Sequence, residues 1–169
     1  MDKFIQSDFH RMGRRPLLFQ VFMRKCANSS GLLRFFYRCV YRYLCNKRGI
    51  EISWRTKIGY GLYIGHAYGI TVNHKVEIGN NCNIHKGVTI GQENRGDRKG
   101  TPKIGDDVWI GVNVTIVGKV TIGDDVLIAP NSYVNCDVPS HSIVVGNPCS
   151  IRHCENATEH YINNRYTDV

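Results

Sequence analysis

The stretch that decides the fold is residues 104–128, which read IGDDVWIGVNVTIVGKVTIGDDVLI. A branched aliphatic residue returns at every sixth position from Ile104 to Ile128, and glycine directly follows three of these aliphatics. A period of six is neither the 3.6-residue period of a helix nor the two-residue alternation of a half-buried strand. Each hexad therefore indicates a short strand followed by a corner, where Gly, Asn and Asp tolerate dihedral angles that other residues resist.

The same period extends from residue 52 to residue 134. We expect one register up to Val76, a shift of two residues, and a second register that resumes at Ile78. Residues 92–102 are charged, contain glycine and carry no core aliphatic, so we expect a loop that leaves the repeat. The periodic aliphatics are Ile52, Ile58, Ile64, Ile70, Val76, Ile78, Ile84, Ile90, Ile104, Ile110, Ile116, Ile122, Ile128 and Val134.

Three hexads would form one three-sided coil, and stacked coils would pair as parallel strands. The fourteen aliphatics predict about four to five coils of ~18 residues each. We therefore expect a mainly β fold over residues 50–152, with a short helical segment at 1–49 and a C-terminal tail at 153–169. A β-sandwich with chance periodicity is disfavoured, because it would not keep so many positions in phase.

The N-terminal third carries the positive charge of the chain. The net charge of the 169 residues is +8, but residues 1–48 hold 11 Lys/Arg and 2 Asp/Glu, which is +9. We expect helices over residues 17–25 and 32–48. The second would place an arginine stripe beside an aromatic and aliphatic face. The stripe is Arg34, Arg38 and Arg42, and the face is Leu33, Phe36, Tyr37, Val40, Tyr41 and Leu44.

Two alternatives remain open for this basic segment. It could lie at an anionic membrane surface, or its face could pack on the end of the repeat or on a neighbouring subunit. Nucleic acid is a weaker expectation, because no groove-reading motif accompanies the charge. The start of the sequence lacks a signal-peptide core and no apolar run could span a bilayer. We expect a cytoplasmic protein that the basic segment could hold on the inner face of the cell membrane.

The sequence gives little support for a metal site or for a catalytic serine or cysteine nucleophile. The seven cysteines include no CxxC pair, and Cys149 and Cys154 lack a second pair to complete a tetrahedral set. Three histidines, His66, His74 and His85, fall in the middle coils, but their gaps of eight and eleven residues do not suit a zinc site. Ser132 and the cysteines do not sit in a nucleophile motif. We therefore expect no metal, and direct attack by a bound acceptor that a histidine deprotonates.

His66 is the favoured general base. It follows Ile64-Gly65, so we expect it near a corner and pointing outward, in a small uncharged stretch that leaves room for a substrate. A histidine near its unperturbed pKa of ~6.5 is suited to accept a proton at neutral pH. His74 and His85 are the next candidates.

Three segments resemble a known class of proteins. Residues 58–72 (IGYGLYIGHAYGITV) and 81–91 (NCNIHKGVTIG) resemble the active-site coils of serine acetyltransferases and related sugar O-acetyltransferases of the hexapeptide-repeat class. Residues 144–151 (VVGNPCSI) resemble the closing motif of that class. The likeness covers roughly residues 50–152.

The resemblance implies a left-handed β-helix, a homotrimer, and acetyl-CoA bound in the cleft between neighbouring β-helices. His66 matches the catalytic histidine. The resemblance also implies that Gly111 and Ala129 line the pantetheine arm and that Lys103 or Arg152 meets the phosphates. Asn73, His74, His85 and Arg98 are the candidates for acceptor binding.

The acceptor side departs from the serine acetyltransferase pattern. Gly65 stands where that family has an aspartate, His74 stands where it has a glutamate, and the loop at 97–102 lacks a histidine. We therefore expect a sugar hydroxyl as acceptor, in the assembly of surface polysaccharide. The alternatives are a serine O-acetyltransferase of cysteine synthesis, since Arg98 could bind the serine carboxylate, and a β-helical scaffold without catalysis.

Overall fold

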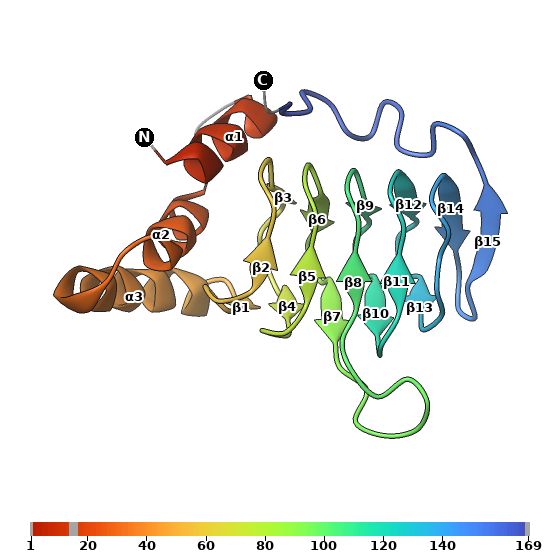
Figure 1. Cartoon of the computed structure of the whole chain (residues 1–169), viewed down its shortest axis with the longest axis horizontal. Helices are drawn as coiled ribbons and strands as arrows, with labels where there is room; N and C mark the ends of the chain where they lie inside the picture. The colour runs from red at the N-terminus through yellow and green to blue at the C-terminus, as the bar shows by residue number, and fades with distance from the viewer. Residues whose placement is uncertain (1, 14–16, 168–169) are drawn as a thin grey trace.

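The computed structural model describes residues 2–13 and 17–167, in which three helices precede a stack of short strands (Figure 1). The helices are α1 (Lys3–Met12), α2 (Leu18–Ala27) and α3 (Gly31–Asn46). The predicted helices at 17–25 and 32–48 correspond to α2 and α3, whereas α1 was not predicted. The parts of the predicted segments that fall on residues 1, 14–16 and 168–169 lie outside the described residues.

The strands form three sheets that make the sides of a triangular prism. Sheet A has the order β1-β4-β7-β10-β13, sheet B has β11-β8-β5-β2, and sheet C has β15-β14-β12-β9-β6-β3. All neighbours pair in parallel except β14 and β15, which are antiparallel. The chain passes from A to B to C in each coil, which confirms the predicted mainly β fold, a left-handed β-helix.

The strand bounds are as follows. In sheet A they are β1 (Glu51–Ile52), β4 (Thr71–Val72), β7 (Thr89–Gly91), β10 (Thr115–Val117) and β13 (Tyr133–Val134). In sheet B they are β2 (Lys57–Ile58), β5 (Glu77–Ile78), β8 (Lys103–Ile104) and β11 (Thr121–Ile122). In sheet C they are β3 (Tyr63–Gly65), β6 (Asn83–His85), β9 (Trp109–Ile110), β12 (Val126–Ile128), β14 (Ser142–Val145) and β15 (Ser150–His153).

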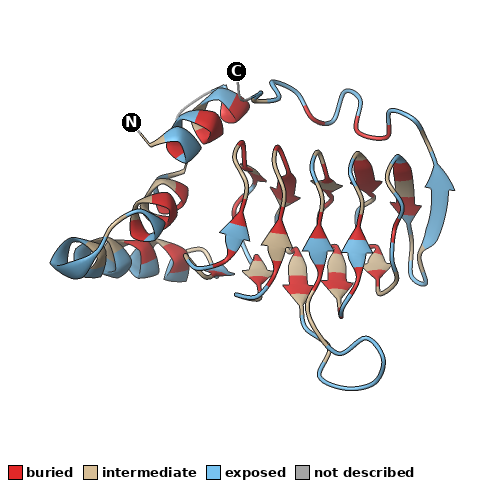
Figure 2. Ribbon diagram, in the orientation of Figure 1, coloured by how far each residue is buried: buried red, intermediate tan, exposed pale blue. Residues whose placement is uncertain are grey.

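The core is the row of periodic aliphatics. All fourteen predicted positions are buried, none with more than 8% of its surface exposed. Figure 2 shows buried residues, in red, recurring along the stacked strands. Burying a branched aliphatic side chain stabilises a fold by ~1.5–3 kcal/mol. The six-residue period is therefore the main source of stability of the β-helix.

The predicted register shift occurs at a different corner. Ile64 pairs with Ile84 and Val72 pairs with Ile90, so the chain uses eight residues where the next coil uses six. The two extra residues therefore lie between β3 and β4, not after Val76. The prediction was wrong because Ile70 and Val72 are both buried, so burial alone does not identify the strand residue.

The N-terminal helices are fixed to the first coil by buried charge. The Arg24 guanidinium forms a two-point ion pair with Asp8, at 3.0 and 3.1 Å, and donates to the carbonyl oxygens of Ile58 and Gly59. Burial raises the pKa of Asp8, and Arg24 opposes that shift. Removing one partner of such a pair typically costs 3–5 kcal/mol, because it leaves a buried charge without compensation.

Helix α3 has one packed side and one exposed side. Of its predicted aromatic and aliphatic face, Tyr41 is buried and Tyr37 packs against the core, whereas Phe36 is 58% exposed. Leu32 is 88% exposed and Phe35 is 65% exposed. Within the described residues no helix is both long and apolar enough to cross a bilayer.

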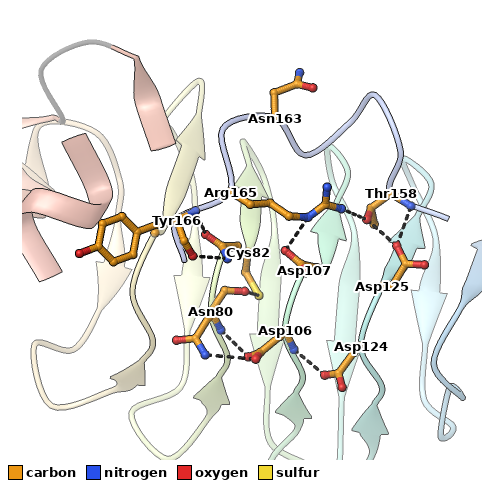
Figure 3. Close-up of polar contacts among 12 residues, drawn as sticks. Asn80, Cys82, Asp106, Asp107, Asp124, Asp125, Thr158, Asn163, Arg165 and Tyr166 are labelled. Carbon is orange, nitrogen blue, oxygen red and sulfur yellow. Dashed lines mark hydrogen bonds and ion pairs between the residues drawn. The ribbon is translucent and has the colours of Figure 1, made fainter. Parts of the chain in front are cut away.

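The C-terminal strap, which we define as residues 157–166, crosses the corners between sheets B and C (Figures 1 and 3). Asn81, Asp107 and Asp125 occupy equivalent corners, with φ of 54°, 54° and 52°, and their side chains all bind the strap. Asp125 accepts hydrogen bonds from the Thr158 amide at 3.0 Å and from its hydroxyl at 2.6 Å.

The hydrogen bonds that Asp125 accepts also lower the pKa of its carboxyl group. Burial alone would raise the pKa of this carboxyl, but hydrogen bonds from Thr158, His141 and the Ala157 amide hold it below the ordinary value. The Asp125 carboxylate in turn raises the pKa of His141. The strap is therefore anchored by a carboxylate that stays ionised at neutral pH.

Candidate functional site

His66 sits on the corner that carries the two extra residues. It follows the last residue of β3 with φ of 52°, and its side chain is exposed. The equivalent corner of the next coil has three residues, Lys86, Gly87 and Val88, between β6 and β7, whereas five residues separate β3 from β4. Because of the two extra residues, His66 projects outward from the edge between sheets C and A. A general base needs such a position, because it must contact a bound substrate.

The ring of His85 lies directly over Gly65. A Cβ at Gly65 would fall 2.5 Å from His85 Nδ1, so the ring fills the space that any side chain at position 65 would need. Burial, and then the nearby His66, lower the pKa of His85, which keeps its imidazole neutral at pH 7. The Gly65 departure noted in the sequence is therefore part of the packing of the site.

The His66 ring has no hydrogen-bond partner within residues 2–13 and 17–167. A catalytic histidine is usually oriented by a third group, often a carboxylate. With Gly65 in place and His85 over it, no carboxylate can reach the ring from the preceding residue. Among the described residues, no carboxylate is hydrogen-bonded to this ring.

Gly111 and Ala129 lie on the same edge of the prism as His66. Gly111 directly follows β9, and Ala129 directly follows β12, at the ends of two sheet-C strands stacked beyond β3 and β6. The structure thus brings His66 and the two residues predicted to line the pantetheine arm onto one edge, between sheets C and A. A long, narrow co-substrate could follow that edge.

Asn73, His74 and Arg98 lie on a different edge, between sheets A and B. Asn73 Nδ2 donates to Gln92 Oε1 at 3.2 Å, which ties this corner to the base of the loop at 92–102. The predicted loop is confirmed, since it leaves the prism between β7 and β8 and closes with a bridge between Glu93 and Gly100 (Figure 1). The Arg98 side chain is exposed on it.

The two predicted phosphate-binding residues are not near each other. Lys103 is on β8 in sheet B, 3.8 Å from Glu77, and Arg152 is on the antiparallel strand β15. Both are exposed. Neither lies on the His66 edge of its own chain, so their role stays a prediction.

No three His, Cys, Asp or Glu side chains cluster as metal ligands within residues 2–13 and 17–167. The seven thiols are unpaired, although the Cys136 and Cys149 sulfurs lie 3.8 Å apart.

Sequence reasoning missed several side chains that surround His85. Its ring centroid lies 4.8 Å from that of Trp109, and Trp109 lies 5.0 Å from Tyr161 of the strap. Arg11 of α1 reaches the same region, with its guanidinium carbon 6.0 Å from the centroid of the Tyr63 ring. Only the outward position of Trp109 in its hexad was a usable signal, because the strap and α1 are fixed by tertiary contacts.

The family model and the curated relatives that match this chain all describe transferases. Residues 101–136 match a family described as bacterial transferase hexapeptide (six repeats). The chain is 41% identical over 105 residues to serine acetyltransferase 2 of Arabidopsis thaliana, which is 61% of this chain and 32% of that protein. It is 39% identical over 98 residues to the Helicobacter pylori serine acetyltransferase, 58% of this chain and 57% of that protein.

Solved structures extend the likeness to the helices. The soybean serine acetyltransferase apoenzyme superposes with a TM-score of 0.73 at 28% identity, covering 89% of this chain and 70% of that chain. The soybean enzyme complexed with serine gives a TM-score of 0.68 at 31% identity, covering 80% and 56%. The chain thus spans only about a third to three fifths of the two curated relatives. Both of these relatives are named serine acetyltransferases.

Proposed function

We propose that this chain, as a member of the hexapeptide-repeat acyltransferase superfamily, is an acetyl-CoA-dependent O-acetyltransferase with His66 as its general base. One observation carries the proposal. The only corner between sheets C and A that is lengthened, among those the structure describes, is the one that presents His66. His66 would accept the proton of the acceptor hydroxyl as that oxygen attacks the thioester carbonyl. The imidazolium would then return the proton to the departing CoA sulfur.

L-serine is the acceptor that the comparisons support. Both curated relatives are named for it, and one of the solved relatives holds it. In this proposal Arg98 binds the serine carboxylate, because a guanidinium can pair with a carboxylate through two parallel hydrogen bonds. The serine ammonium would then need to pair with a carboxylate that lies outside the Gly65 corner.

A hydroxyl of a sugar is the second candidate, and the Gly65 corner favours it. The His85 ring leaves no room for an acidic side chain at position 65. Position 65 therefore provides no carboxylate that could pair with the ammonium group of serine. A buried charge without a partner is costly, whereas a neutral ring with hydroxyls needs only neutral hydrogen bonds.

We further propose that the working unit is a homotrimer. His66 and Arg98 lie on different edges of one prism, separated by the side that holds β4. That side spans about five residues, or roughly 16 Å at the rise of a strand. A site that uses both residues therefore needs two chains, with the loop at 92–102 of one chain reaching the His66 edge of the next.

We also propose that α3 brings the protein to the inner, cytoplasmic face of the cell membrane. Its exposed side carries Leu32, Phe35 and Phe36 next to Arg38 and Arg42, and the helix contains no acidic residue. An apolar face edged by cations is typical of helices that lie in the interface of anionic bilayers.

The proposed function is tested by mixing the full chain with acetyl-CoA and one acceptor at a time, and by measuring both free thiol and acetylated product. We expect product with L-serine or with a sugar, and no product without an acceptor hydroxyl. Thiol release that leaves no acetylated product with any acceptor would contradict transfer.

A further inference from the structure

Two cysteines meet at the C-terminal end of the β-helix, where β13, β14 and β15 lie (Figure 1). Cys136 comes two residues after β13. Cys149 is the last residue of the turn between β14 and β15, residues 146–149, which we call the closing turn. The two cysteines are 13 positions apart in the sequence, yet their sulfurs lie 3.8 Å apart and within hydrogen-bonding reach of each other.

The geometry of the pair suits a disulfide. A sulfur–sulfur bond is about 2.05 Å long, so the two sulfurs would have to approach by about 1.8 Å. Rotation of each side chain about its Cα–Cβ bond moves the sulfur over such a range. Both cysteines are half-buried, and Cys149 packs against the hydrophobic core. A small oxidant could therefore reach the pair, whereas a bulky one would meet the surrounding side chains.

The closing turn is hydrogen-bonded to the last coil. The Tyr133 amide donates to the Gly146 carbonyl at 3.0 Å, and the Gly146 amide donates to the Ser132 hydroxyl at 3.0 Å. Just before the turn, the Ala129 amide donates to the Val144 carbonyl at 2.8 Å. The last coil of a solenoid has a neighbouring coil on one side only, so it opens more readily than an inner coil. A covalent link between the two cysteines would restrain that opening.

The environment of Cys136 suits it to react second. Burial, and then the hydrogen bond to Cys149, raise the pKa of Cys136, and the positive charge of Arg98 opposes the rise. Cys136 is therefore a protonated thiol at neutral pH. Oxidants react with the thiolate and not with the thiol. Cys136 is thus poorly suited to attack an oxidant, but it is well placed to resolve an oxidised Cys149.

We propose that Cys136 and Cys149 form a reversible disulfide when the protein meets hydrogen peroxide, and that this disulfide locks the closing turn onto the last coil. The Cys149 sulfur attacks one peroxide oxygen, which gives a sulfenic acid and one water. The Cys136 sulfur then attacks the sulfenic sulfur, and the displaced hydroxide leaves as water with the Cys136 proton. Two thiols are oxidised to one disulfide, and one peroxide is reduced to two waters. A thiol reductant reverses the change.

The inference is independent of the proposed function, because no step uses His66 or acetyl-CoA. It is connected to that function only by position, since Ala129 is predicted to line the pantetheine arm. In a reducing compartment disulfides are usually transient and respond to oxidants. A pair that stays reduced until it meets peroxide therefore agrees with the expected cytoplasmic location.

The first test treats the full chain with hydrogen peroxide and identifies the disulfide by mass spectrometry. Cleavage before Asp137 and after Arg152 places Cys136, Cys149 and Cys154 on three separate peptides. We expect the first two of these peptides to be linked after peroxide and separate after dithiothreitol. A link to Cys154 instead, or oxidation of Cys149 to a sulfinic acid without a link, would overturn the proposal.

The peroxide experiment uses a Cys39→Ser background, because Cys39 is exposed on α3 and could join two chains. In this background, Cys149→Ser and Cys136→Ser should each abolish the link. Cys154→Ser is the matched control, and it should leave the link intact. A link that includes either remaining cysteine after its partner is replaced would show that the pairing is not specific.

The second test measures hydrogen exchange in the reduced and the oxidised protein. We expect the amides of Tyr133 and Gly146 to exchange at least tenfold more slowly after oxidation, because the disulfide restrains local opening. The Thr89 amide, which donates to the Val114 carbonyl in an inner coil, should not change. In Cys149→Ser, peroxide should slow none of these amides. Equal exchange in the two states of a fully linked protein would refute the lock.

Discussion

Placing a methyl group at Gly65 tests the packing on which the acceptor side depends. In Gly65→Ala the new Cβ would lie 2.5 Å from His85 Nδ1, 2.7 Å from its Cε1 and 3.3 Å from Tyr63 Cε1. The His85 ring cannot swing away freely, because Trp109 packs against it at 4.8 Å. Overpacking of this kind costs about 1–3 kcal/mol.

The assay is urea unfolding of Gly65→Ala at one fixed protein concentration, because the stability of an oligomer depends on concentration. We expect a loss of about 1–3 kcal/mol in the free energy of unfolding. In a His85→Ala background the loss should disappear, which gives a coupling energy of about 1 kcal/mol or more. Gly91→Ala is the control, since its Cβ would meet only Val117 Cγ1 at 3.5 Å.

Two results would refute this reasoning. A Gly65→Ala protein as stable as Gly91→Ala would show that the His85 ring does not occupy the space. A loss of stability that persists in the His85→Ala background would show that the backbone at position 65, and not the ring, rejects a side chain.

Three further predictions concern the strap, the helices and the loop. Because Asp125 has a lowered pKa and His141 a raised one, the strap should lose protection from hydrogen exchange as the pH falls below about 3.8, and part of it as the pH rises above about 6.5; protection that is flat with pH, after correction for intrinsic rates, would contradict this. Leu32→Ser with Phe36→Ser should reduce co-sedimentation with anionic liposomes several-fold, and wild-type binding that is equal for neutral lipid would remove the electrostatic argument. Arg98→Ala should raise the KM of an acceptor that carries a carboxylate by about tenfold and leave neutral acceptors unaffected, and equal effects on both would argue against ion pairing.

The sequence alone predicts most of the β-helix, because the buried residue of each strand can be recognised from its own position in the six-residue repeat. The recurrence of aliphatics such as Ile104 and Ile110 fixes the period, and the absence of core residues at 92–102 fixes the loop. The corner that holds His66 was misread, since Ile70 and Val72 are both buried and only strand pairing shows which of them belongs to β4. Register at an irregular corner is a property of two coils and not of one.

The surroundings of His85 were harder to predict for a similar reason. Tyr161 and Arg11 come from opposite ends of the chain and meet only because the strap and α1 cross the same coil. Their positions depend on long-range contacts such as the 3.0 Å hydrogen bond from Arg165 Nε to Asp107 Oδ1. No local sequence pattern predicts such a contact. His66 and Gly65 could be found in the sequence because neighbouring residues define their corner.

The central claim is that His66 is the base for acetyl transfer. Steady-state measurement of acetylated product tests it most directly, with the wild type and His66→Ala compared at saturating acetyl-CoA and with the preferred acceptor. His66 is exposed, so the variant should keep the oligomeric state and circular dichroism of the wild type. We predict that its kcat falls by ~10²–10⁴-fold. A folded His66→Ala protein that turns over within about threefold of the wild type would contradict the account.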